Sequence, residues 1–156
     1  LDTGTLPARD LTAKWTTQEW VHFIEGMPKT LPVEKLAALD AAYRFTGTPN
    51  GELAMRWYPL AVRSGYMLAF EPMTEFLQTV GRRKLILPIY TALVQTPEGL
   101  ALARQVFERA RPGSHPITAA SVQRIIDEAR PRQAPVDPAQ ATTGLGKQPA
   151  SSAPAR

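Results

Sequence analysis

Three adjacent cations, Arg82, Arg83 and Lys84, precede a run of apolar residues. The segment 81–90 reads GRRKLILPIY, and its pattern predicts a helix with these cations in its first turn. The start of a helix carries partial positive charge, so a cation there is unfavourable by roughly 0.3–1 kcal/mol and acids are preferred. Cations and free backbone N–H groups that face the same way suit a carboxylate or a phosphate. The segment is therefore a candidate anion-binding site, because functional sites are where local rules are broken.

The alternative interpretation of this segment is a solvated basic turn. Runs of like charge on a protein surface usually face water, and the charge pattern alone favours that outcome.

Other residues with reactive side chains are few. The absence of Cys excludes disulfides and thiol chemistry. The only two histidines, His22 and His115, lie too far apart in sequence to form a metal-binding motif. We expect His115, which precedes Pro116, to pack or cap a loop. The sequence therefore predicts no catalytic residue and no metal site within this chain.

Charge and hydropathy exclude further classes of protein. The net charge of +4 divides evenly: the segment after Arg130 has three cations against one acid, and the remainder has 15 cations against 13 acids. With its charges so nearly balanced, residues 1–130 have no strongly basic surface, so we expect no nucleic-acid partner. Binding of DNA or RNA that weakens with added salt stays open as a weaker hypothesis. Aromatic residues could form a stacking platform for bases, but their helical spacing favours core packing. No apolar run approaches the roughly 18 residues of a membrane-spanning helix, so we expect no membrane partner.

The two ends of the chain differ in composition from its middle. The chain starts without Met and without a targeting segment, so we expect an internal cut of a longer protein and leave the compartment open between cytoplasm and periplasm. We interpret residues 1–12 as a connector from an absent upstream catalytic domain and residues 13–130 as a helical domain. Residues 131–156 are rich in Pro and Ala, and such a tail is expected to be disordered.

The middle of the chain is helical by every local signal. No segment alternates with period two, so the predicted class is all-α. Thr16 and Glu19 fit a capping box, Asn50 can cap a helix, and Thr96 followed by Pro97 is a strong helix start. Pro59 should kink its helix or shift a boundary. The seven expected short helices lie at about 17–25, 32–45, 51–64, 68–80, 82–95, 97–110 and 118–129.

An ordered set of motifs carries a family resemblance. Residues 55–57 (MRW), 81–90 and 115–119 (HPITA) occur in the order and spacing of one family. Over roughly residues 11–128, the chain resembles the C-terminal helical domain of the leukotriene A(4) hydrolase family and its bacterial aminopeptidase relatives, zinc metallopeptidases of the aminopeptidase N type. The resemblance implies an α-α superhelix of armadillo or HEAT character that packs on a thermolysin-like catalytic domain and closes the substrate cleft.

The resemblance also implies where the chemistry would lie. In the family, zinc sits in the catalytic domain on a His-Glu-x-x-His helix with a further Glu, and this chain has no such motif. The fragment alone is therefore expected to lack peptidase activity and to need no cofactor of its own. The family's Gly-Arg-x-Lys motif maps onto Arg82 and Lys84, which would bind the carboxylate of short peptide substrates. Arg83 falls where the family requires no cation, and Arg56 could pair with an acid at the domain interface.

A second hypothesis comes from a different class of function. The chain could be a stand-alone helical-repeat module that binds a partner protein with its concave face. That hypothesis predicts a large exposed apolar or charged groove.

Overall fold

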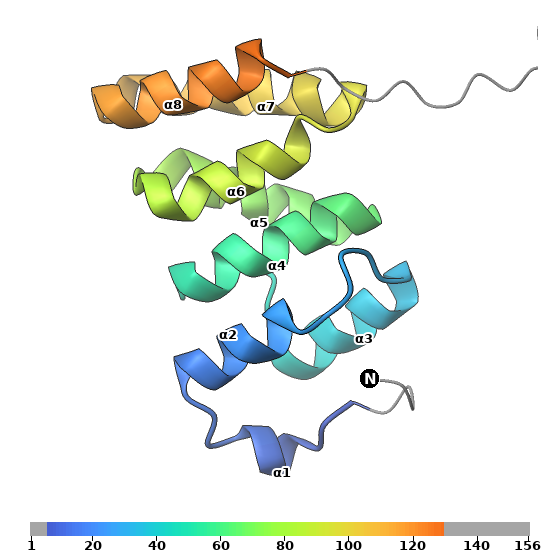
Figure 1. Ribbon diagram of the computed structural model, residues 1–156. Helices are drawn as coiled ribbons and strands as arrows, with labels where there is room; N and C mark the ends of the chain where they lie inside the picture. The colour runs from blue at the N-terminus through green and yellow to red at the C-terminus, as the bar shows by residue number, and fades with distance from the viewer. Residues whose placement is uncertain (1–5, 130–156) are drawn as a thin grey trace, which may run out of the picture.

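The computed structural model describes residues 6–129 (Figure 1). The described residues form eight α-helices and two 3-10 turns and contain no strand, which confirms the all-α class. The predicted tail 131–156 and the first five residues of the predicted connector lie outside the described residues. The helices are α1 (Arg9–Thr12), α2 (Thr17–Glu25), α3 (Val33–Tyr43), α4 (Gly51–Ser64), α5 (Phe70–Thr79), α6 (Arg83–Leu93), α7 (Pro97–Ala110) and α8 (Pro116–Asp127).

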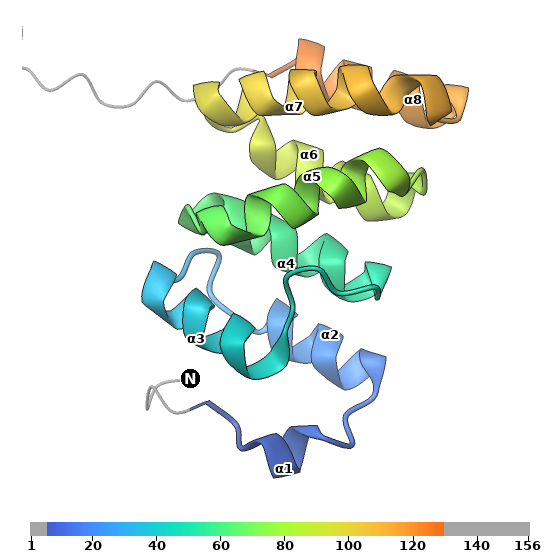
Figure 2. The same cartoon turned by 180° about the vertical axis from the view of Figure 1, so that it is seen from behind.

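The helices stack in two rows. One row contains α2, α4, α6 and α8, and the other contains α3, α5 and α7, as opposite views of the molecule show (Figures 1 and 2). In the first row α4 packs against both α2 and α6, and α6 packs against α8; in the second, α5 packs against α7. Successive helices thus alternate between the rows, which is the arrangement of stacked helix pairs. The superhelical twist of an armadillo or HEAT repeat stays a prediction.

Side-chain caps begin four of the helices. Thr16 and Glu19 form the predicted capping box, in which each side chain binds the backbone N–H of the other residue. The Asn50 side chain accepts from the backbone N of Glu52 at 3.0 Å, and Thr96 Oγ1 accepts from the backbone N of Gly99 at 3.0 Å. His115 Nδ1 accepts from the backbone N of Ile117 at 3.3 Å and caps α8, which confirms the capping role expected for this histidine.

Proline occurs inside two neighbouring helices. Pro59 lies within α4 and Pro88 within α6, and both helices continue past the proline. No helix boundary falls at Pro59, so the boundary shift that we allowed for does not occur. Because proline has no N–H, neither residue can donate to the carbonyl four positions earlier, which belongs to Met55 in α4 and to Lys84 in α6.

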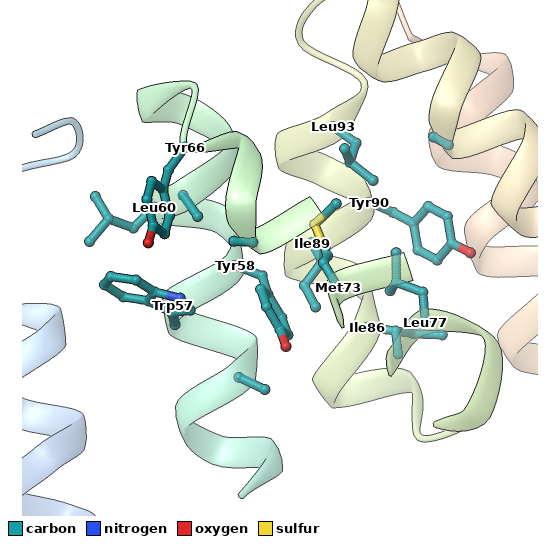
Figure 3. Packing of buried hydrophobic residues seen from close by; sticks show 14 of the residues in the cluster. Trp57, Tyr58, Leu60, Tyr66, Met73, Leu77, Ile86, Ile89, Tyr90 and Leu93 are labelled. Atoms are coloured by element: carbon teal, nitrogen blue, oxygen red, sulfur yellow. The ribbon is translucent and has the colours of Figure 1, made fainter. Parts of the chain in front are cut away.

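A continuous apolar core joins the two rows. Tyr58 of α4 is buried on the side that faces Met73 of α5 and Ile89 of α6, whereas Trp57 is buried on the other side of α4, near Tyr66 (Figure 3). One cluster of buried side chains runs from Val21 in α2 to Ile126 in α8. The burial of Trp57 and Tyr58 confirms core packing for these two aromatic residues and leaves them no role as a stacking surface.

The helices of the first row all start along one edge of the molecule. Asn50 Nδ2, at the start of α4, donates to Thr17 Oγ1 at the start of α2, over 3.1 Å. Lys84 Nζ in the first turn of α6 donates to Glu52 Oε1 in the first turn of α4, over 3.0 Å. Thr118 Oγ1 in the first turn of α8 donates to the backbone O of Gly81 just before α6, over 3.4 Å. The four helices therefore run in the same direction.

Candidate functional site

The three predicted cations lie at the start of α6 and are exposed. Arg82 is the N-cap residue, and Arg83 and Lys84 are the first two residues of the helix. No acidic residue occurs in this first turn, as the sequence indicated. Within residues 6–129, the side chains of Arg82 and Arg83 make no hydrogen bond or ion pair. Lys84 differs from both because it has a carboxylate partner.

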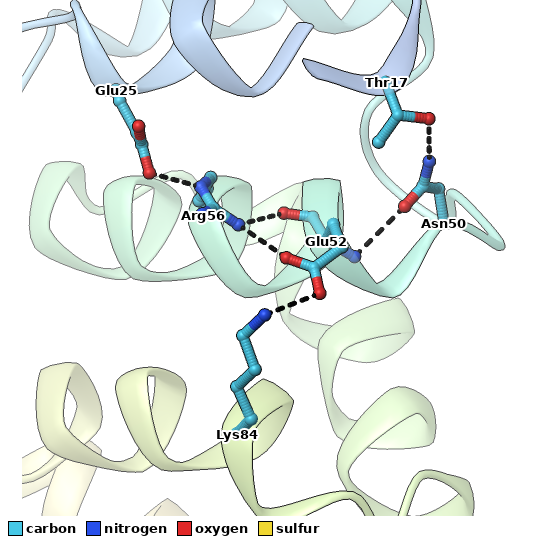
Figure 4. A network of polar contacts seen from close by, with 6 residues as sticks. All are labelled: Thr17, Glu25, Asn50, Glu52, Arg56 and Lys84. Atoms are coloured by element: carbon cyan, nitrogen blue, oxygen red, sulfur yellow. Dashed lines mark hydrogen bonds and ion pairs between the residues drawn. The ribbon is translucent and has the colours of Figure 1, made fainter.

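Glu52 of α4 is the partner of Lys84. Lys84 Nζ donates to Glu52 Oε1 at 3.0 Å, across the boundary between α6 and α4 (Figure 4). The acid that the first turn of α6 lacks is thus supplied by the first turn of the neighbouring helix. The unfavourable placement of a cation at this helix start is therefore compensated in three dimensions, although no compensation is visible in the local sequence.

Arg56 holds the other side of the same carboxylate. Its Nη1 donates to Glu52 Oε2 at 3.1 Å and to the Glu52 backbone O at 2.8 Å, and its Nε donates to Glu25 Oε1 of α2 at 2.6 Å. Both acidic partners of Arg56 lie within the described residues, and pairing with an acid across a domain interface stays a prediction. Arg56 connects α2 to α4, and Glu52 connects α4 to α6 (Figure 4).

The charges of this four-residue network balance. Glu25 and Glu52 supply two negative charges, and Arg56 and Lys84 supply two positive ones. Hydrogen bonds from Lys84 and then from Arg56 hold the pKa of Glu52 below its ordinary value. Burial acts to lower the pKa of Arg56, but hydrogen bonds to Glu25 and Glu52 outweigh that effect and the pKa is raised. Glu52 is consequently ionised at neutral pH.

A large open groove runs beside the network. It has a volume of about 1270 Å³ and is lined by the segment after α2 and by α4 and α6. Apolar side chains line much of it: Ile24, Met27, Met55, Pro59, Leu60, Val62, Leu87, Pro88 and Ala92. Its charged lining residues are the four cations Lys29, Arg56, Arg63 and Lys84 and the single acid Glu25. Lys84 thus lines the groove, whereas Arg82 is not among its lining residues.

Arg63, one of the groove cations, has a hydrogen-bond partner but no carboxylate partner among the described residues. Arg63 Nε donates to the backbone O of Lys29 at 2.9 Å, and no carboxylate of the described residues pairs with its guanidinium. Burial lowers the pKa of Arg63. The groove therefore combines apolar surface with positive charge, which suits an apolar peptide segment that ends in or carries a carboxylate.

The described residues contain no cluster of metal-binding side chains. In residues 6–129 no three His, Asp or Glu side chains lie close enough together to hold a metal ion, and Cys is absent. Of the helices in this part of the chain, none has the length and apolar character required to cross a bilayer.

The sequence could have identified one part of the network. Glu52 and Arg56 stand four residues apart on one helix, a spacing that brings opposite charges together. The pairs Glu52–Lys84 and Glu25–Arg56 join residues that are 32 and 31 positions apart, and no local pattern indicates them.

Comparison with known proteins places this chain in a described family. The profile of the family "Leukotriene A4 hydrolase, C-terminal" matches residues 15–126. The match includes α2 to α7, the network and most of α8.

Relatives of the chain are about 30% identical to it over the aligned residues. It is 31% identical over 121 residues to leucine aminopeptidase 2 of Neurospora crassa and 28% identical over 116 residues to aminopeptidase B of Mus musculus. It is 27% identical over 117 residues to a leukotriene A-4 hydrolase homolog of Botryotinia fuckeliana. These matches cover 76%, 72% and 73% of this chain. The chain spans only 18% of the length of each of these relatives.

Proposed function

The chain belongs to the family of leukotriene A4 hydrolase C-terminal domains, and from that premise we propose that it is the accessory domain of a zinc aminopeptidase. In this proposal the domain packs on an upstream catalytic domain of the same chain, closes the substrate cleft and binds the carboxylate of short peptides. The observation that carries the proposal is Lys84, which belongs to the cationic first turn of α6 and lines a largely apolar groove, in a chain related to aminopeptidases.

Arg82 and Lys84 have the chemistry that carboxylate binding requires. A guanidinium is planar and can donate to both oxygens of a carboxylate, whereas an ammonium acts as a compact charge with three donors. Both residues are exposed at the start of a helix, where backbone N–H groups also favour an anion. Binding of the far carboxylate would fix the register of a short peptide, so that its scissile bond lies at a constant place.

The α2–α4–α6 face is the face that we propose to lie toward the catalytic domain. It contains the groove, whose apolar lining and excess of cations suit contact with another protein surface and with a peptide. In the proposed parent enzyme, zinc would be held by the catalytic domain and would polarise the scissile carbonyl. The residues of this chain would bind and orient the substrate.

A substitution of Arg82 tests the proposed role in the parent enzyme. The measurement is kcat/KM for a tripeptide with a free carboxylate and for the same tripeptide as a carboxamide. We expect Arg82→Ala to lower kcat/KM for the free acid by about tenfold or more, because a hydrogen bond to a charged group contributes about 1.5–3 kcal/mol. The carboxamide should be cleaved as well by the variant as by the native enzyme.

Arg83→Ala is the matched control for this experiment. Arg83 is the adjacent cation and is also exposed, and its substitution by Ala removes the same charge. We expect it to change kcat/KM for the free acid by less than about threefold, since an exposed charge at this distance is screened. Equal use of the free acid and the carboxamide by the native enzyme would contradict the carboxylate role of Arg82 and Lys84.

A stand-alone interaction module is the second candidate. The same groove of about 1270 Å³ favours it, because a partner protein could occupy that surface. The intact mass of the natural gene product separates the two candidates. A product several hundred residues longer, with an upstream His-Glu-x-x-His motif, would support the accessory domain, and a product that starts near Leu1 would support the module.

A further inference from the structure

We propose that Glu52 is a positioning residue, which holds the ammonium group of Lys84 in place for the substrate carboxylate. This inference rests on the proposed function of Lys84. It starts from one contact: Lys84 Nζ lies 3.0 Å from Glu52 Oε1, between residues of two different helices (Figure 4).

The Glu52 carboxylate is itself fixed from several sides. The backbone N–H of Glu52 donates to the Asn50 side chain at 3.0 Å. Arg56 Nη1 binds both the backbone O and Oε2 of Glu52, and Arg56 is in turn held by Glu25 at 2.6 Å. Since Oε2 is occupied by Arg56, Oε1 is the oxygen that faces Lys84. The network therefore presents a single oriented acceptor to α6.

Lys84 gains a defined position from this acceptor. Its side chain is 63% exposed, and a free lysine on a surface samples many rotamers. An ammonium has three N–H donors, and the bond to Glu52 uses one of them, so two remain for a substrate carboxylate. Glu52 thus restricts the side chain before the substrate arrives and leaves it able to bind.

Arg82 and Lys84, the two proposed binding residues, differ in whether a nearby acid neutralises their charge. Glu25 and Glu52 balance Arg56 and Lys84, so this network as a whole adds no net attraction for an anion. Arg82 has no such partner among the described residues, so its charge is not neutralised by a contact. Arg82 therefore supplies most of the attraction, and Lys84, through Glu52, supplies a donor at a fixed place.

Four variants of the full-length parent enzyme test this inference: Glu52→Ala, Glu52→Gln, Lys84→Ala and the double variant Glu52→Ala/Lys84→Ala. The readouts are KM and kcat for a tripeptide with a free carboxylate and for its carboxamide. We expect Glu52→Ala to raise KM for the free acid about fivefold to tenfold, because Lys84 loses the contact that positions it. KM for the carboxamide should stay unchanged, because Arg56 keeps its bonds to Glu25 and to the backbone O of residue 52. The double variant should be no worse than Lys84→Ala, because Glu52 acts through Lys84.

Glu52→Gln is the conservative variant, and we expect it to retain a KM for the free acid within about twofold of the native value. Its amide oxygen can accept from Lys84. Arg56 would keep its bonds to Glu25 and to the backbone O of residue 52. Glu98→Ala is the matched control, since Glu98 also stands in the first turn of a helix, is exposed, and forms no ion pair within the described residues. Glu98→Ala should leave KM and kcat unchanged for both the free acid and the carboxamide.

Three results would overturn the inference and leave the proposed function of Lys84 intact. One is that Glu52→Ala impairs the free acid and the carboxamide equally, which would indicate a purely structural role. Another is that the effects of Glu52→Ala and Lys84→Ala add up in the double variant. The third is that Lys84→Ala raises KM for the free acid while Glu52→Ala does not. If Lys84→Ala itself has no effect, the proposed function of Lys84 fails, and this inference fails with it.

Discussion

All four tyrosines of the chain resist ionisation. Burial raises the pKa of Tyr66 to about 12, with a further contribution from its hydrogen bond to Asp40 Oδ2 at 2.9 Å. Burial alone raises the pKa of Tyr90 to about 12, and it is the main cause of the raised pKa of Tyr58 and of Tyr43. The phenol groups are therefore more acidic in the unfolded chain than in the folded one.

The direction of these shifts predicts alkaline unfolding. A group with a raised pKa contributes stability that is fully present below its unfolded pKa of about 10 and is lost as pH rises through about 12. At pH 10 we expect less phenolate absorbance in the native chain than in denaturant, where the tyrosines should be about half ionised. A near-ultraviolet pH titration with and without guanidinium measures this. Half-ionisation near pH 10 in the native chain would contradict it.

Local contacts at the residue scale could be predicted, and distant ones could not. The capping box of Thr16 and Glu19 spans three positions, so the two residue types indicate the contact by themselves. A local conflict of charge, together with the family resemblance, indicates Arg82 and Lys84 from the sequence. The resolution of that conflict for Lys84 lies 32 positions away at Glu52, and only the packing of α4 against α6 brings the two together.

At the element scale, Gly99 marks a close approach of α7 to the end of α6. A Cβ atom at this position would lie 2.0 Å from the backbone O of Leu93 and 2.9 Å from Thr96 Oγ1. Backbone cannot give way as a flexible side chain can. We therefore expect Gly99→Ala to lower the free energy of unfolding by more than about 2 kcal/mol, as measured by urea denaturation.

Gly113 provides the comparison for that substitution. A Cβ atom there would have no neighbour within 4 Å. Gly113→Ala should change the free energy of unfolding by no more than about 0.5 kcal/mol. Similar losses for the two variants would show that the loss at Gly99 does not arise from the contact with Leu93.

Helix starts were easier to predict than other features of the elements. Asn50 and Thr96 begin their helices as predicted, because a cap acts on residues two or three positions away. The last helix starts at Pro116 instead of about Thr118, and the signal was His115 as cap with proline at the first helical position. The short helix α1 has no side-chain cap and lies where a connector was expected, so no local signal indicated it.

At the scale of the whole molecule, the core predicts a single unfolding transition. Buried side chains from α2 to α8 form one cluster, although stacked helices with mostly neighbour contacts can also unfold in parts. All three tryptophans, Trp15, Trp20 and Trp57, lie in the first half of the chain, whereas far-ultraviolet circular dichroism reports every helix. We expect the two signals to give the same urea midpoint. An earlier or later fluorescence midpoint would show that the two halves unfold separately.

The class of the molecule was predictable, but its groove was not. The absence of period-two alternation and the presence of repeated caps establish an all-α chain from sequence alone. The two rows of helices agree with the family resemblance. The groove is lined by segments as distant as Met27 and Gln95, and its existence depends on how three helices pack, which no single segment specifies.

The common direction of α2, α4, α6 and α8 determines where the sequence of the molecule can change without disturbing its core. Contacts between Thr17 and Asn50, Glu52 and Lys84, and Gly81 and Thr118 place the beginnings of these helices along one edge. The chain segments that lead into the four helices therefore end side by side on that edge. Insertions or exchanges in such connections leave a packed core intact. The edge could consequently acquire new loop sequences, and with them new specificity, while both rows of helices stay unchanged.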